Sequence, residues 1–401
     1  MASIRYFLLD PGFEDFDSHH GSVAETLIGD ASSTRKTITV LASKKLSNSV
    51  KNLKGKIIPF FTTPCYTNNL EPLPAFKENE LAEKFQAELS DLFRRYNINQ
   101  NDVIVLHTAF SHLFLGLAKF LSCIPKLHIP KLIVCGMFDP GIASPKFMDE
   151  AMRYSWFIKN KLSLSFLARS LPSEKLVFAT SCNEYKIGYE ALTGASFLIH
   201  PAINYQPSQP FSREIKGRKR LLLFVGSVKE DKGTSFILNN SEHLCKSFPN
   251  VDFVLHWNTN SPGSIEYKHA ESQLRRLGSR VNNFDVLFGT LTTEQYELLF
   301  DSVQGVIASY MPNKYKYKTS GIFWDVLRRS HCNLLCSKGT WLERESNFME
   351  ERAYFFDYGD IDSMIRAIKE WEIDESSVDL NSTQYKNAIC RSFSEWLLSR
   401  F

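Results

Sequence analysis

Short runs of aliphatic, β-branched and aromatic residues alternate with longer helical patterns along most of this chain. The short runs are apolar on both faces, as strands are when helices cover both sides of a parallel sheet. Such alternation is typical of α/β proteins, in which a helix connects each strand to the next parallel one. In the first half, strands are predicted at Ile4–Asp10, Thr37–Ser43, Lys56–Phe61, Asp102–Thr108, Lys131–Met137, Lys175–Ser181 and Ser196–Pro201. Helices are predicted between them at Ser22–Asp30, Glu78–Tyr96, Ser111–Ser122 and Ser144–Leu162.

A polar segment, residues 204–219, interrupts this alternation once. It is rich in Pro, Ser, Gln, Lys and Arg and has no apolar period, which is typical of a linker between domains. After it, strands are predicted at Arg220–Ser227, Val251–Trp257, Val286–Leu291, Val303–Ser309, Asn333–Ser337 and Ala353–Asp357. The helices that alternate with them are predicted at Gly233–Phe248, Tyr267–Leu277, Thr293–Asp301, Ser320–Arg329, Ile361–Trp371 and Thr383–Phe401.

Chain length also favours two domains, because 401 residues exceed one ordinary hydrophobic core. We therefore expect two doubly wound parallel-sheet lobes of the Rossmann type, residues 1–203 and 220–380. The last segment, residues 381–401, is expected to form a helix that packs back toward the first lobe. Ligands of such folds bind at the carboxyl ends of the strands, so a cleft between the lobes is the expected site.

Composition excludes several classes of protein. The formal net charge of +3 lacks the basic excess of a nucleic-acid binder, so no nucleic-acid partner is expected. The eight cysteines form no C-x-x-C pair and lie mostly in apolar runs, which favours reduced thiols in a cytoplasmic protein. The short apolar run at the N-terminus is interpreted as a strand rather than a signal peptide, and no apolar run has the length of a transmembrane helix.

A basic loop in the second lobe carries the strongest functional signal. It follows the predicted strand Val303–Ser309, and a helix is expected to begin where the loop ends. Backbone N–H groups at a helix start form an anion site, and nearby lysines favour phosphate. A capped helix after a solvated basic loop fits the same residues equally well. The candidate anion-binding residues are Lys318, Thr319, Ser320, Gly321 and Ile322.

A second loop, after the strand that begins at Arg220, has the same features: backbone N–H groups at a helix start and nearby lysines. It contains Gly226, Ser227 and Lys229 and ends in Lys232-Gly233, which opens the next helix. Two such loops at neighbouring strand ends would hold a diphosphate between them. An ordinary strand-to-helix turn with exposed lysines is the alternative. Asp325, one turn into its helix, is positioned to bind a ribose diol or only to complement the helix dipole.

The first lobe offers a loop with two glycines and two histidines after its first strand. Gly12, His20 and Gly21 are candidates for the acceptor side of the site, although a surface loop is the alternative. His107 ends an otherwise apolar strand, and a polar residue at the carboxyl end of such a strand indicates a ligand-binding site. A histidine that is buried and hydrogen-bonded in the core would fit this position equally well. Asp15 and Asp17 lack a third ligand, so no metal is expected.

The chain resembles the family-four glycosyltransferases, also called glycosyl transferases group 1, which are retaining enzymes with two lobes. The resemblance covers nearly the whole chain in order. Its motifs are the loop from Gly12 to Gly21, Asp102-Val-Ile-Val-Leu-His107, Ala179–Tyr185 leading to Leu198–Pro201, Phe224-Val-Gly226 with Lys232-Gly233, and Thr319-Ser-Gly-Ile-Phe-Trp-Asp325 followed by Asn333–Trp341.

This resemblance implies specific roles. Lys232 would neutralise the diphosphate, the backbone of Ser320 and Gly321 would cradle it, Asp325 would bind the ribose, and His107 would lie over the sugar ring. The family usually has two glutamates separated by seven intervening residues, and here Tyr317 and Asp325 occupy those positions. It also has an arginine where this chain has Ser227. Lys229 and Lys318 are the candidates for the missing cation.

The implied activity is glycosyl transfer with retention, from a nucleotide-diphosphate sugar to a hydroxyl of a glycan, polysaccharide or lipid-linked acceptor. Lysines and helix N–H groups would stabilise the leaving diphosphate, so no metal is expected to be required. Two alternatives stay open: a nucleotide-sugar epimerase of the same fold, and a degenerate transferase that binds only a nucleotide or a partner protein. A helix mixing aromatics and cations, residues 152–169, also leaves a peripheral contact with the inner face of the membrane open.

Overall fold

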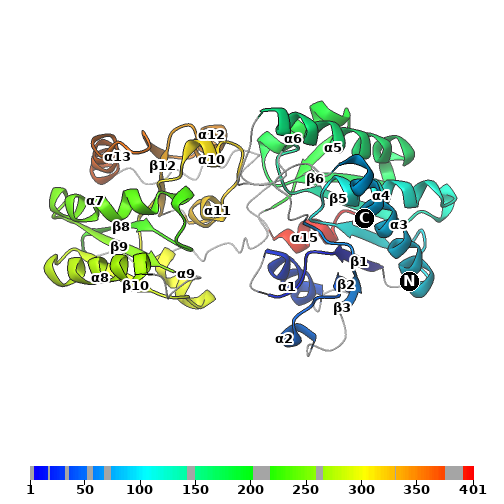
Figure 1. Ribbon diagram of the computed structural model, residues 1–401, viewed down its shortest axis with the longest axis horizontal. Helices are drawn as coiled ribbons and strands as arrows, with labels where there is room; N and C mark the ends of the chain where they lie inside the picture. The colour runs from blue at the N-terminus through cyan, green and yellow to red at the C-terminus, as the bar shows by residue number, and fades with distance from the viewer. Residues whose placement is uncertain are drawn as a thin grey trace. The chain divides into compact units, whose positions relative to one another are not determined.

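The computed structural model describes residues 4–16, 19–31, 36–51, 57–66, 74–141, 150–201, 217–258, 265–329, 331–374 and 392–401. The chain divides into two compact units. The first consists of Met1–Gln206 together with Ala388–Phe401, and the second of Pro207–Asn387. Each unit contains one parallel sheet with helices on its faces, which confirms the predicted α/β class (Figure 1).

The first unit is built on a seven-stranded sheet in the order β3-β2-β1-β4-β5-β6-β7. Neighbouring strands are parallel throughout, and the chain starts in the middle of the sheet and winds outward in both directions. Its strands are β1 (Arg5–Asp10), β2 (Thr37–Ser43), β3 (Ile57–Phe61), β4 (Val103–Leu106), β5 (Lys131–Gly136), β6 (Leu176–Thr180) and β7 (Phe197–Ile199). Its helices are α1 (His19–Ala31), α2 (Asn48–Lys51), α3 (Ala75–Tyr96), α4 (Ser111–Ser122), α5 (Glu150–Ser170), α6 (Asn183–Thr193) and α15 (Phe393–Leu398), with the 3-10 turns η1 (Lys126–His128) and η2 (Ser173–Lys175).

The C-terminal helix α15 belongs to the core of the first unit. Phe393 and Trp396 are buried in the same cluster as side chains of β1, β2, β4 and β5. The Tyr6 hydroxyl on β1 donates a hydrogen bond of 3.1 Å to the Leu398 carbonyl. Figure 1 shows α15 in red beside α1 and the strands coloured blue, so the two ends of the chain meet in one core.

The second unit repeats this strand order with six strands, β10-β9-β8-β11-β12-β13. Its strands are β8 (Lys219–Phe224), β9 (Val251–Trp257), β10 (Phe284–Phe288), β11 (Gly305–Ala308), β12 (Asn333–Ser337) and β13 (Ala353–Phe356). Its helices are α7 (Thr234–Ser247), α8 (Ile265–Arg280), α9 (Thr293–Asp301), α10 (Pro312–Tyr315), α11 (Gly321–Leu327), α12 (Trp341–Phe348) and α13 (Ile361–Ile373), with the 3-10 turn η3 (Glu230–Lys232). All four residues of β11 are buried, as expected for a central strand covered on both faces.

Several elements differ from the sequence-based expectation. Helix α5 covers Glu150–Ser170 rather than Ser144–Leu162, and α2, α6 and α10 have no counterpart among the predicted helices. β10 covers Phe284–Phe288 rather than Val286–Leu291, because Gly289 has a φ of +87° and turns the chain out of the sheet. Helix α12 was not predicted, although Thr340 caps it by accepting a hydrogen bond from the Glu343 N–H. Most of the predicted linker lies outside the described residues, and its last residue, Lys219, already belongs to β8.

Candidate functional site

The second unit brings its two glycine-containing loops to the same edge of its sheet. β8 and β11 are neighbouring parallel strands, so the loops that follow them, residues 226–233 and 309–321, both start at the carboxyl edge. The chain leaves β8 toward β9 on one side and returns at β11 on the other. This point, where the strand order reverses, is the position at which open α/β sheets bind ligands.

Close backbone contacts join these two loops. Gly233 has a φ of +74°, and a Cβ on it would lie 2.0 Å from the Ser309 carbonyl oxygen. The Ser309 hydroxyl donates to the Lys232 carbonyl at 3.1 Å, and the Met311 N–H donates to the Asp231 carbonyl at 3.0 Å. Only glycine permits this approach, so the residue type at 233 sets the distance between the loops.

The Lys232 ammonium is held inside this arrangement. A Cβ on Gly226 would lie 3.4 Å from Lys232 Nζ, so the lysine folds back over the start of its own loop. Burial is the main reason that the pKa of Lys232 is lowered to about 8; the nearby Lys229 and Lys318 contribute to this lowering, and Asp231 opposes it. Lys318 Nζ lies 3.4 Å from Asp231 Oδ2, which connects the second loop to the first. A partly buried cation beside two others is a site that an anion would stabilise.

Helix α11 begins where the second loop ends. Ser320 is its N-cap residue, and its hydroxyl interacts with the Tyr310 hydroxyl at 3.1 Å rather than capping the helix. Gly321 is exposed, whereas the Ile322 side chain is 8% exposed and packs inward. Thr319, Ser320, Gly321 and Ile322 would therefore contact a ligand mainly through their backbone. Because α11 has only seven residues, those local N–H groups matter more than a helix dipole.

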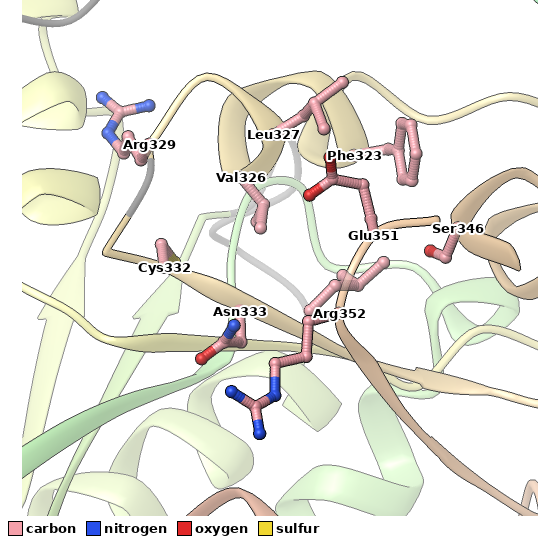
Figure 2. A pocket seen from close by; sticks show the side chains of 10 residues that line it. Phe323, Val326, Leu327, Arg329, Cys332, Asn333, Ser346, Glu351 and Arg352 are labelled. Carbon is pink, nitrogen blue, oxygen red and sulfur yellow. The ribbon is translucent and has the colours of Figure 1, made fainter. Parts of the chain in front are cut away.

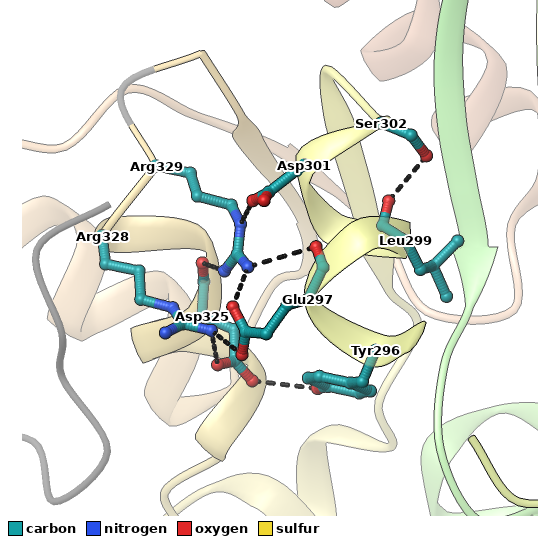
Figure 3. Close-up of polar contacts among 8 residues, drawn as sticks. All are labelled: Tyr296, Glu297, Leu299, Asp301, Ser302, Asp325, Arg328 and Arg329. Atoms are coloured by element: carbon teal, nitrogen blue, oxygen red, sulfur yellow. Dashed lines mark hydrogen bonds and ion pairs between the residues drawn. The ribbon is translucent and has the colours of Figure 1, made fainter. Parts of the chain in front are cut away.

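Asp325 lies one turn into α11, and other side chains already hold its carboxylate (Figure 3). The Tyr296 hydroxyl on α9 donates to Asp325 Oδ2 at 2.9 Å, and Arg328 Nη2 lies 3.4 Å from Oδ1. Burial raises the pKa of Asp325, while the positive charge of Arg328 lowers it. The adjacent Arg329 is buried and donates to Asp301 and Glu297, which fixes α11 against α9.

His256 is a site residue that the sequence interpretation did not single out. It lies near the end of β9, and its Nδ1 accepts a hydrogen bond of 3.3 Å from the Gly226 N–H. Its Nε2 lies 2.8 Å from the Gly289 carbonyl, so the imidazole is neutral with its proton on Nε2. Burial and the charge of Lys232 lower the pKa of His256, which favours this form. The sequence feature that could have identified His256 is its position near the carboxyl end of a predicted strand, where such folds bind their ligands.

The first unit places Gly12, His20 and Gly21 together after β1. The His20 ring is 2% exposed and would lie 2.3 Å from a Cβ on Gly12. A Cβ on Gly21 would lie 2.4 Å from the Phe16 Cα, so both glycines are required by close packing rather than by backbone angles. His20 Nδ1 lies 2.6 Å from Asp10 Oδ1, and its Nε2 lies 2.8 Å from the Tyr66 hydroxyl.

His107 follows β4 and is fully buried. Its ring lies 5.2 Å from that of Phe393 on α15 and 5.6 Å from that of His200, measured between centroids. Burial also lowers the pKa of His200 to about 4, so that imidazole is neutral. The structure thus gives His107 packing partners in the core, and its expected role over the sugar ring stays a prediction.

A small cavity of about 20 Å³ lies at the opposite edge of the second sheet (Figure 2). Phe323, Val326 and Leu327 of α11 line it together with Asn333, at the start of β12, and Arg352, just before β13. This volume holds about one water molecule. The cavity is therefore not the candidate ligand site.

The described residues contain neither a metal-binding cluster nor a membrane-spanning helix. Among those that the structure describes, no group of three His, Cys, Asp or Glu side chains is arranged to bind a metal ion. None of the described helices is long and apolar enough to cross a bilayer.

Comparison with known proteins identifies the fold. No family model matches the chain, and no curated protein matches it significantly. It resembles sucrose-phosphate synthase from Thermosynechococcus elongatus with a TM-score of 0.58 and 11% identity, over 98% of this chain and 96% of the other. It resembles a UDP-forming α,α-trehalose-phosphate synthase from Burkholderia xenovorans with a TM-score of 0.60 and 11% identity, over 99% and 98%. For HepE from Anabaena, solved with UDP and glucose, the TM-score is 0.52 and the identity 13%, over 99% and 95%. At these identities the likeness concerns the fold, and the chain has the two-lobed GT-B fold.

Proposed function

We propose that this protein is a retaining glycosyltransferase that moves a sugar from a nucleotide-diphosphate donor to a hydroxyl acceptor. The observation that carries the proposal is the pair of loops, residues 226–233 and 309–321, at the carboxyl ends of adjacent strands in the second unit. They are joined through Gly233 and Ser309 and enclose the Lys232 ammonium. The fold shared with sucrose-phosphate and trehalose-phosphate synthases supports the same conclusion.

The proposed chemistry follows from the charges at this edge. As the bond between sugar and diphosphate breaks, negative charge grows on the leaving phosphate. Lys232, assisted by Lys229 or Lys318, would stabilise that charge together with the backbone N–H groups at the start of α11. The acceptor hydroxyl would attack from the face on which the diphosphate leaves, so no nucleophile of the protein is needed on the opposite face. Asp325, held by Tyr296, would accept hydrogen bonds from the ribose.

The finer details are proposals at the same site. UDP is the first nucleotide to test, because HepE was solved with UDP and with UDP-glucose and the trehalose-phosphate synthase is UDP-forming. We propose that the acceptor is a glycan or a lipid-linked sugar and that turnover requires no metal. A cytoplasmic location fits the buried free thiols, such as Cys135 and Cys336.

Binding of UDP tests the proposal directly. UDP at 100 times its dissociation constant would add about 2.7 kcal/mol to the stability of the folded state and raise the melting temperature by several degrees. Lys232→Ala should abolish this rise. Lys338→Ala is the matched control, because Lys338 follows β12 at the same edge but pairs with Asp357. If UDP raised the melting temperature equally in the wild type, Lys232→Ala and Lys338→Ala, the assignment of Lys232 to the binding site would be contradicted.

Hydrolysis of UDP-glucose without added acceptor then separates an enzyme from a degenerate binder. An enzyme should release glucose slowly, and Lys232→Ala should lose this activity while Lys338→Ala keeps it. Binding of UDP without any hydrolysis or transfer would favour a degenerate transferase that only binds the nucleotide. Tyr317 and Ser227, which replace the family's glutamate and arginine, are the residues that suggest this alternative.

A peripheral membrane contact is proposed from the surface of α5. Ile158, Leu162 and Phe166 lie one turn apart and are 42%, 68% and 43% exposed. Apolar side chains in such a row, with Lys161 and Arg169 on the same helix, are typical of interfacial helices. The protein should float with vesicles containing anionic lipid, and Leu162→Glu should weaken this flotation. Flotation that does not depend on Leu162 would exclude α5 as the contact.

A further inference from the structure

The His256 side chain joins two turns of the second unit that lie far apart in the sequence. His256 is near the end of β9, and β9 lies between β8 and β10 in the sheet. Its Nδ1 accepts a hydrogen bond of 3.3 Å from the Gly226 N–H, after β8. Its Nε2 lies 2.8 Å from the Gly289 carbonyl oxygen, after β10. One imidazole ring therefore connects the chain segments that follow the two strands on either side of its own.

The chemistry of the two backbone groups determines how the ring is used. A peptide N–H only donates and a carbonyl oxygen only accepts, so the ring carries its proton on Nε2 and leaves Nδ1 bare. Burial and the charge of Lys232 lower the pKa of His256, which disfavours a second proton. His256 is 3% exposed, and the backbone occupies both of its nitrogens. It can therefore act on a ligand only through the turns that it holds.

The hydrogen bond to Gly226 lies where the regular pairing of β8 with β9 is interrupted. The register shifts after Leu222, so that Phe224 pairs with Leu255. Beyond that pair, β8 and β9 meet again in a single bridge between Ser227 and Asn258. Gly226 lies between these two points, and the His256 side chain accepts from its N–H in place of a strand backbone.

Gly226 depends on such an acceptor because its own packing does not fix it. Its φ is +94°, a value that glycine adopts freely, but glycine adopts negative φ values as readily. A Cβ on Gly226 would meet Lys232 Nζ at 3.4 Å, and within 4 Å it would meet no other described atom beyond the neighbouring residues. The hydrogen bond to His256 thus holds the peptide group over which the Lys232 ammonium lies.

We propose that His256 is a positioning residue that fixes the Gly226 turn, and with it the Lys232 ammonium, in the arrangement that binds a nucleoside diphosphate. This inference rests on the proposed transferase function. Without an acceptor at position 256, the Gly226 N–H would be left unpaired in a partly buried turn, and the glycine would rotate toward another partner. Lys232 would then lose the surface on which it rests, and the diphosphate would bind more weakly.

Three substitutions in the full-length protein separate the two hydrogen bonds of the ring. In His256→Asn, the amide oxygen takes the place of Nδ1 and can accept from Gly226, but the side chain is too short to reach Gly289. In His256→Gln, the amide nitrogen takes the place of Nε2 and can donate to Gly289, while the Gly226 N–H loses its acceptor. His256→Ala removes both bonds. His243→Asn is the matched control, because His243 is an exposed histidine on α7 of the same unit.

Calorimetric titration with UDP measures the effect on binding. His256→Ala and His256→Gln should each bind UDP about 10-fold more weakly than the wild type, which is the effect of one unpaired, partly buried donor. His256→Asn should recover most of this loss, and His243→Asn should bind UDP like the wild type. The Asn and Gln variants each keep one of the two bonds, so a merely structural role would weaken binding equally in both. If His256→Gln binds UDP as tightly as His256→Asn, the inference is overturned.

Hydrogen exchange of the Gly226 amide decides the inference even if the protein does not bind UDP, which would refute the proposed function alone. It is measured by NMR in ligand-free, ¹⁵N-glycine-labelled protein. The amide should exchange slowly in the wild type and in His256→Asn, and at least about 10-fold faster in His256→Ala and His256→Gln. Equal exchange rates in these four proteins would show that His256 does not hold the turn, whatever the result with UDP.

Discussion

The Lys232 side chain illustrates how one residue can favour binding at the expense of the unliganded fold. Its ammonium is partly buried near Lys229 and Lys318, which lowers its pKa from 10.5 to about 8. The unfolded chain therefore binds more protons than the folded protein between pH 8 and pH 10.5, so this group makes the fold more stable as pH rises through that window. A bound diphosphate reverses the balance, because its negative charge raises the pKa of Lys232 again.

We therefore predict that UDP affinity falls as the pH rises above 8 and that binding takes up protons in this range. Calorimetry in two buffers with different ionisation enthalpies measures that uptake. The Lys232→Met variant should bind UDP weakly and without proton uptake. At neutral pH it should also melt at a higher temperature than the wild type, because the partly buried ammonium that destabilises the fold has been removed. Equal proton uptake in Lys232→Met would assign the effect to another group.

The 226–233 loop shows how a single backbone contact couples two elements. Gly233 opens α7 with a φ of +74°, and its Cα faces the Ser309 carbonyl at the end of β11. Any Cβ there would overlap a backbone oxygen, which cannot move without displacing β11. Gly359, in the same unit, has a φ of +82° with nothing within 4 Å of an added Cβ. The two glycines differ in packing but not in backbone strain.

We predict that Gly233→Ala abolishes UDP binding and destabilises the protein by clearly more than the about 1–2 kcal/mol that a left-handed alanine costs. Gly359→Ala should show that smaller cost and keep its UDP affinity. Urea unfolding and calorimetry measure the two effects. Normal UDP affinity in Gly233→Ala would mean that the spacing of the loops does not matter for the ligand.

Elements were predicted well where their signal is local. The strand Val251–Trp257 was placed to the residue because its apolar run is continuous and bounded by polar residues. Lys232 and Gly226 could be proposed because both belong to one short loop after a strand. The contacts that complete the sites were not predictable, because they join distant residues: Lys318 to Asp231 and Tyr66 to His20. No periodicity in the sequence encodes such a pairing.

At the scale of the whole molecule, the chain is not divided simply into an N-terminal and a C-terminal half. α15 lies at the end of the sequence, but its Phe393 and Trp396 complete the core of the first unit. The sequence analysis expected a helix in residues 381–401 that packs toward the first lobe, whereas the individual side chains that it contacts could not be predicted. The first unit therefore cannot complete its core until the last residues are present.

This arrangement predicts separate effects for two buried tryptophans. Trp396 is 1% exposed in the first unit, and Trp371 on α13 is 1% exposed in the second, where its Nε1 lies 3.3 Å from the Gln304 carbonyl. Replacing a buried tryptophan by alanine costs about 3–5 kcal/mol. In calorimetric melting, UDP should raise the transition of the second unit, so the two transitions can be assigned. Trp396→Ala should lower only the UDP-insensitive transition and Trp371→Ala only the UDP-sensitive one. If both substitutions lowered the same transition by the same amount, the two units would not unfold separately, and the C-terminal helix would stabilise the molecule as one cooperative body.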